Sequence, residues 1–183
     1  MSIKLKNLVF HSDTFFEEIT YEKKNLLIPF VFVAIMGLFG IWLLWHFTFG
    51  YSLSNIVEMM AFPFIVWVIV TLVIFSVARI FSGTGSLFAT FQNIGFGTFP
   101  LTLAVAGSVR IVAVINGSPS TPVDYSLLPF LSWMVLPFWS FYLWYCGILH
   151  AHRLSRMKAA VSVSSVAILL YVVWALNPFG GTM

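Results

Sequence analysis

Two charged side chains inside long apolar segments are the residues of this sequence best placed to do chemistry. Glu58 and Arg110 each fall within a run long enough to cross a membrane, where a charge is costly and marks a functional or structural pair. The two runs are neighbours and both charges fall in the same half of the membrane, so an ion pair between two helices is one interpretation. A second places Glu58 at the interface with Arg110 reaching the headgroups. A transport or catalytic role is the third.

A second polar group lies between the last two apolar runs. It consists of His150, His152, Arg153, Arg156 and Lys158. Residues two apart on a helix point about 200° apart, so the two histidines cannot chelate one metal ion together. We therefore expect no metal site here, but a basic cluster that attracts anionic lipid headgroups.

A glycine-punctuated stretch, residues 79–100, connects the second and third apolar runs. It contains Arg79, Gly83, Gly85, Gly95, Phe96 and Gly97. Its glycines do not have the spacing of a dinucleotide-binding turn, and no strand–helix–strand pattern surrounds them. We expect a structured turn at a membrane surface, and the alternative is an ordinary loop without a recognition role.

Signatures of enzymes are missing from the sequence. There is no H-E-x-x-H motif, nucleophile elbow, P-loop or carboxylate cluster. The basic residues are split among separate loops and form no stripe, which argues against a nucleic-acid partner. We expect a protein without enzymatic activity and without a cofactor.

The composition places all these residues in an integral membrane protein. The chain has 183 residues, of which 60% are hydrophobic and only 8% are charged, against about a quarter in soluble domains. Five apolar runs are long enough to cross a membrane, namely residues 26–47, 56–80, 97–115, 126–149 and 159–176. Because the runs are continuous rather than alternating, they predict an all-α bundle of five transmembrane helices in one domain, residues 25–183.

The positions of lysine and arginine predict the orientation of this bundle. Of the nine such residues, Arg110 lies within the third run, Arg79 lies at the end of the second, and the other seven precede the first run or lie between the fourth and fifth, so all except Arg110 fall on one side. The loops on the other side, residues 48–55, 116–125 and 177–183, contain none. Positive loops stay inside, so the N-terminus is expected in the cytoplasm and the C-terminus outside.

The N-terminal segment, residues 1–24, is amphipathic. Thr14 followed by Glu17 has the spacing of a capping box, and Phe15 and Ile19 share one helix face. We expect a short helix that lies on the membrane surface with its apolar side toward lipid. A frayed tail is the alternative.

Small residues also share a helix face in the last apolar run. Ala160, Ser164 and Ala167 are spaced four and three residues apart. Such spacing permits close helix packing in lipid, either within the chain or between copies of it.

Several of these motifs together resemble one family of membrane proteins. The stretches are residues 78–88, the Gly-Phe-Gly-Thr sequence at 95–98 with Pro100, residues 152–159 and, more weakly, residues 13–18. They are similar to the Yip family, the Ypt/Rab-interacting membrane proteins. The resemblance implies five spans, a cytosolic N-terminus, and a scaffold or adaptor role without enzymatic activity.

The sequence departs from the eukaryotic members of that family. The long N-terminal region with its Asp-Leu and Gly-Pro motif is not present before the first run, and the family's Gly-Tyr is Gly95-Phe96 here. A small GTPase is therefore a doubtful partner. The compact form resembles prokaryotic members, which implies a multi-pass protein of a prokaryotic plasma membrane.

Two hypotheses for function follow. The leading one is a scaffold or adaptor that binds proteins or anionic lipids at its cytosolic face and associates with itself or with other membrane subunits. Its expected contact surface combines residues 79–97 with the basic turn at 150–158. The rival is a small transporter or lipid-translocating protein that uses Glu58 and Arg110.

Overall fold

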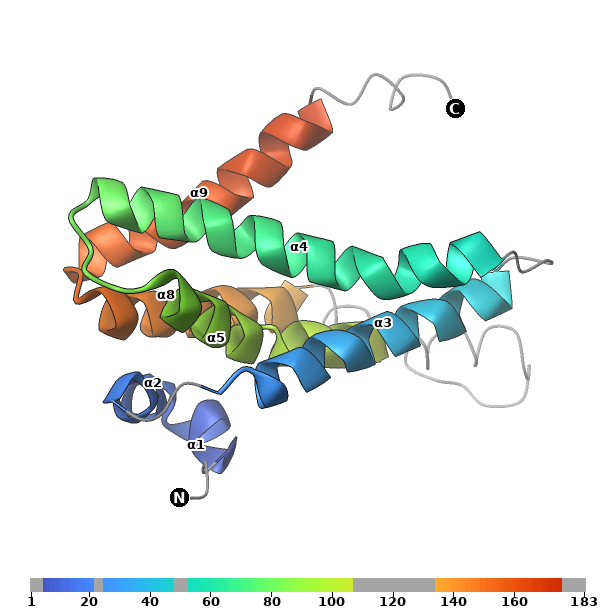
Figure 1. The fold of residues 1–183 in the computed structure, drawn as a ribbon, viewed down its shortest axis with the longest axis horizontal. Helices are drawn as coiled ribbons and strands as arrows, with labels where there is room; N and C mark the ends of the chain where they lie inside the picture. The colour runs from blue at the N-terminus through green and yellow to red at the C-terminus, as the bar shows by residue number, and fades with distance from the viewer. Residues whose placement is uncertain (1–4, 22–24, 48–52, 107–133, 176–183) are drawn as a thin grey trace.

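The computed structural model describes residues 5–21, 25–47, 53–106 and 134–175 (Figure 1). Within these ranges every regular element is a helix. The helices are α1 (Leu5–Phe10), α2 (Ser12–Tyr21), α3 (Leu27–Phe47), α4 (Leu53–Ile80), α5 (Leu87–Gly97), α8 (Leu136–His152) and α9 (Arg156–Ala175). Residues 99–106 are also helical. The prediction of an all-α fold is confirmed.

The long helices have an apolar surface that faces outward. Within the described residues, one helical stretch, Ile56–Ile80 of α4, is long and apolar enough to cross a membrane, and Leu27–Ile41 of α3 is a shorter apolar helix. Large side chains on the outer face of α4 are exposed, among them Phe62, Ile65 and Leu72. Exposed apolar surface of this extent suits contact with lipid. The five-span topology stays a prediction, because parts of the runs at 97–115 and 126–149 lie outside the described residues.

The short helix α5 is the centre of the bundle and contacts α3, α4 and α8. It begins after Ser86, whose hydroxyl accepts a hydrogen bond from the Ala89 amide at 3.2 Å. Two indoles donate to its backbone: Trp67 Nε1 to Phe91 O at 3.1 Å and Trp144 Nε1 to Ile94 O at 3.0 Å. The expected surface turn over residues 79–100 is therefore wrong for residues 87–97, which form a helix that is exposed at its start and buried from Gln92 to Gly97.

A break at Thr98 separates α5 from the helical residues 99–106. The Thr98 amide and hydroxyl both donate to Gly95 O, at 3.2 and 2.6 Å. Pro100 then falls in the first turn of the next segment, where its missing N–H removes no helical hydrogen bond. Helical residues 99–106 fall within the apolar run predicted at 97–115, and α5, which ends at Gly97, is a separate helix before that run.

The helices α1 and α2 pack against the bundle through their buried apolar side chains. Leu8, Phe15, Phe16 and Ile19 are buried in a cluster with Phe96, Leu143 and Cys146. The apolar side of the N-terminal segment is therefore occupied by protein, which corrects the expectation that it faces lipid. The capping box is also wrong, because α2 already begins at Ser12 and Thr14 lies inside it.

Candidate interaction face

One end of the bundle gathers most of the predicted contact residues. Here α4 ends, α5 begins, and α8 turns back into α9 (left in Figure 1). Four exposed cationic side chains lie at this end, on α4, on the turn after α8 and on the first turn of α9; they are Arg79, Arg153, Arg156 and Lys158. We refer to these four residues as the basic end.

The loop between α4 and α5 is shaped around a histidine. A Cβ at Gly83 would lie 2.8 Å from His152 Nδ1, and one at Gly85 would lie 2.6 Å from Ala151 O. The Thr84 amide between them donates to His152 O at 3.1 Å. The two glycines are thus required because the loop backbone packs directly on the end of α8.

His152 itself is buried, with a relative exposure of 1%. Its Nε2 lies 2.8 Å from Thr90 Oγ1, and that hydroxyl lies 3.0 Å from Ser86 O. The single hydroxyl proton of Thr90 goes to Ser86 O, so Nε2–H of His152 is assigned as the donor to Thr90. Nδ1 is then the unprotonated nitrogen, and it has no hydrogen-bond partner among the described residues.

The surroundings of His152 keep its ring neutral. Burial, followed by the positive charge of Arg79, lowers its pKa from 6.5 to about 4. The Phe75 ring also lies 5.7 Å from the imidazole. His152 therefore adds no charge to the basic end at neutral pH, which corrects the expectation that it belongs to an exposed cationic cluster.

The cations of the basic end fall into two pairs. Arg79 Nη1 donates to Gly83 O at 3.1 Å and Lys158 Nζ to Phe81 O at 3.4 Å, so these two hold the loop in place. The side chains of Arg153 and Arg156 make no hydrogen bond or ion pair within the described part of the chain, although the Arg153 amide donates to His150 O at 3.4 Å. Arg153 has a left-handed backbone, φ 52° and ψ 40°, which ends α8 and reverses the chain. The turn therefore presents two uncommitted guanidinium groups on a fixed backbone.

The glycine pair of α5 is buried and does not contribute to an exposed face. Gly95, Phe96 and Gly97 all lie in the core. A Cβ at Gly95 would lie 2.5 Å from Pro29 Cβ, and one at Gly97 would collide with the Trp144 ring. These residues, like Gly83 and Gly85, support the predicted contact surface from within and are not part of it.

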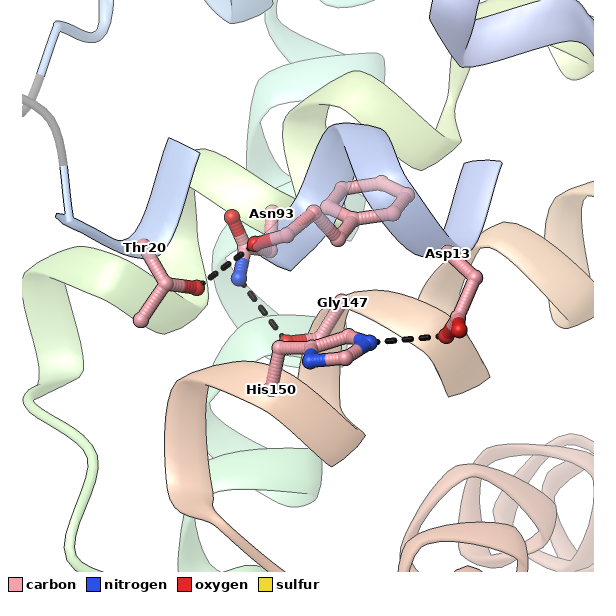
Figure 2. A network of polar contacts seen from close by, with 6 residues as sticks. Asp13, Thr20, Asn93, Gly147 and His150 are labelled. Carbon is pink, nitrogen blue, oxygen red and sulfur yellow. Dashed lines mark hydrogen bonds and ion pairs between the residues drawn. The ribbon is translucent and has the colours of Figure 1, made fainter. Parts of the chain in front are cut away.

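His150 lies on a different side of α8 from His152 and joins α2 to α8. Its Nε2 lies 2.7 Å from Asp13 Oδ1, as Figure 2 shows. Deeper in the same contact, Asn93 Nδ2 donates to Gly147 O at 2.9 Å, which links α5 to α8 (Figure 2). The sequence did not indicate either contact, because the partners are 137 and 54 residues apart.

The predicted pair of Glu58 and Arg110 stays a prediction. Glu58 is exposed on α4, and Arg110 lies outside the described residues. In the described part of the chain, no group of three or more His, Cys, Asp or Glu side chains is placed to hold a metal ion.

In the part of the chain that the structure describes, all regular structure is helical, large apolar side chains face outward and four exposed cations gather at one end, which is typical of a helical membrane protein. The family model described as Yip1 domain matches residues 6–177. The chain therefore belongs to the Yip family, and the resemblance seen in its motifs is confirmed. Neither a search of curated proteins nor a search of solved structures found a match.

Proposed function

We propose that this Yip-family protein is a non-enzymatic membrane adaptor that binds its partners through the basic end. The observation that carries the proposal is the pair Arg153 and Arg156, both exposed and neither engaged by a described residue. Their turn has a fixed backbone, with the Leu154 amide donating to Leu149 O at 3.2 Å. Cations held on a rigid backbone attract acidic protein surfaces and anionic headgroups, and binding has to order their side chains but not the turn.

The proposal includes a topology of five spans with the basic end in the cytoplasm. All four cations of that end lie together, as the positive-inside rule requires of a cytoplasmic side. A prokaryotic plasma membrane is the proposed location. Partners are anionic lipids and other membrane subunits, with self-association included.

Charge reversal tests the partner-binding role. Wild type and the double variant Arg153→Glu/Arg156→Glu are solubilised gently from native membranes, and the co-purifying proteins and lipids are quantified by mass spectrometry. We expect the double variant to lose them and the control Lys6→Glu, a reversal of an exposed charge on α1, to retain them. Recovery of wild type as a lone monomer, with no change on reversal, would contradict the proposal.

Cysteine labelling tests the topology separately. In a Cys146→Ser background, Ser155→Cys marks the exposed turn after α8 and Thr182→Cys marks the C-terminal segment. A membrane-impermeant thiol reagent applied to intact cells should label Thr182→Cys and should reach Ser155→Cys only after permeabilisation. The reverse pattern would overturn the orientation.

A further inference from the structure

An open groove runs between α8 and α9 on the outside of the bundle. Its volume is about 390 Å³. Four aromatic side chains of α8 and four mostly small side chains of α9 line it, namely Phe138, Phe141, Tyr142, Tyr145, Ala160, Val163, Ser164 and Ala167. The lining is almost wholly apolar, so the groove suits hydrocarbon.

The small side chains of α9 create the hollow. Ala160, Ser164 and Ala167 do not fill the space beside α8, whereas Phe138 and Tyr142 on α8 are large and at least half exposed. The aromatic rings therefore form a wall, and Tyr142 and Tyr145 stack with their ring centroids 6.4 Å apart. These aromatic rings on α8 and the row of small residues on α9 form the two sides of the groove.

Arg156 lies at one end of this groove, on the same face of α9 as the small residues. Arg156 precedes Ala160 by four residues and Ala167 by eleven, spacings that return to one helix face at 3.6 residues per turn. Arg156 is exposed and has no partner among the described residues. Lys158 lies on another face, where its Nζ donates to Phe81 O. The groove thus has one uncommitted guanidinium at its end.

The distance along α9 from Arg156 to the far end of the groove at Ala167 matches one leaflet of a membrane. From Arg156 to Ala167 the helix rises roughly 16 Å at 1.5 Å per residue. Half of a hydrocarbon core of about 30 Å is about 15 Å. A positive charge at one end and an apolar surface that extends through one leaflet together match the charged headgroup and the acyl chain of a phospholipid.

We infer that this groove binds an anionic glycerophospholipid, with an acyl chain between α8 and α9 and the phosphate at Arg156. The planar guanidinium donates two parallel hydrogen bonds to phosphate oxygens, and Arg153 on the adjoining turn adds a second positive charge. The site would supply the anionic lipid of the proposed function. It rests on that proposal in one respect, since the proposed topology places the lipid in the cytoplasmic leaflet.

Native mass spectrometry of the purified protein tests the site. Delipidated protein in detergent is titrated with phosphatidylglycerol, and with phosphatidylcholine of the same acyl chains as the comparison. We expect Arg156→Gln to weaken phosphatidylglycerol binding about tenfold and to remove the preference over phosphatidylcholine. Lys158→Gln, which removes a cation on another face of the same helix, should change binding by less than about twofold.

A second pair of variants tests the acyl part. Ser164→Leu fills the groove and should displace the lipid, whereas Val161→Leu, at an exposed position of α9 outside the groove, should not. If Ser164→Leu fails to fold, Ala167→Val carries the same test with less added volume. Glycerol phosphate, which has no acyl chain, should not compete with phosphatidylglycerol.

Three outcomes would overturn the inference. Equal losses in Arg156→Gln and Lys158→Gln would indicate only diffuse surface charge. Unchanged binding in the groove-filling variants would show that no acyl chain lies there. Conversion of a dimer to a monomer by Ser164→Leu, with lipid binding intact, would assign the groove to a second copy of the chain. Because the titration needs neither a partner nor a defined orientation, a failure of the adaptor proposal or of its topology leaves this test intact.

Discussion

Gly85 lies directly against His152, with space for a hydrogen but not for a methyl group between them. A Cβ at Gly85 would lie 2.8 Å from ring atoms Cγ and Cδ2 of His152 and 2.6 Å from the Ala151 carbonyl oxygen. This contact fixes the α4–α5 loop over the end of α8. It explains why a stretch that resembles a loop in sequence has a defined structure.

Gly85→Ala should therefore destabilise the protein. Because the nearest clashing atom belongs to the backbone, the loop has to move, and we expect a loss of about 1–3 kcal/mol in the free energy of unfolding. Thermal unfolding in detergent measures it. Ser82→Gly is the matched control, since Ser82 already has a positive φ of 64° and glycine relieves it. Equal stability of wild type and Gly85→Ala would contradict the packing described.

Acid should destabilise the fold in part through His152. Its pKa is about 4 in the folded state and 6.5 ordinarily, so between these values the unfolded chain binds more protons. The stabilising contribution of the neutral ring is complete above pH 6.5 and is lost as pH falls toward 4. In unfolding experiments from pH 7 to pH 4, His152→Gln should show a shallower pH dependence than wild type, because glutamine does not titrate. Parallel curves would show that His152 protonates as freely in the folded protein as in the unfolded one.

Docking of α2 should depend on Phe16 far more than on its ion pair. Phe16 is fully buried against Gly147, whereas Asp13 is exposed at the other end of its contact with His150. Phe16→Ala should cost about 3–5 kcal/mol of docking free energy, and Asp13→Asn less than about 1 kcal/mol. Hydrogen exchange of the α2 amides measures both. Faster exchange in Asp13→Asn than in Phe16→Ala would reverse this order.

The indole of Trp144 should stabilise α5 through its hydrogen bond as well as its volume. Thr98 N–H donates to Gly95 O and not to Ile94 O, and Trp144 Nε1 donates to Ile94 O instead. Trp144→Phe leaves that buried carbonyl without this donor, so we expect a loss of about 1–3 kcal/mol in addition to lost volume. Trp139→Phe, which changes the same residue type in α8 at a partly buried position, is the control for volume. Thermal unfolding compares them, and equal losses would argue against a role for the hydrogen bond.

Helix bounds could be predicted where apolar runs are long. The run at 56–80 lies within α4. The run at 159–176 overlaps α9, but it does not include the first turn of that helix. That first turn contains Arg156 and Lys158, which a hydropathy pattern excludes although a helix accepts them. The exact start of such a helix depends on the turn before it, here the reversal at Arg153.

The role of α5 could not be predicted in the same way. Its sequence contains Gln92, Asn93 and two glycines, which together are typical of a connector. In the folded protein Asn93 donates a hydrogen bond to Gly147 O, and the two glycines leave space for the side chains of Pro29 and Trp144. These partners are remote in the chain, so no local pattern indicates that the segment is buried.

By itself the sequence determined the class of this protein. A chain with so few charges and several long apolar runs belongs in a membrane, where its backbone N–H and C=O groups must be paired within helices. Its motifs indicated the Yip family. Only the tertiary structure decided which residues face outward at the basic end. His152 and the glycines are buried there while Arg153 and Arg156 are exposed, because burial depends on which distant helices pack together. Amino-acid composition determines whether a chain is stable in water or in a lipid bilayer. The packing of the helices determines which residues surround each side chain.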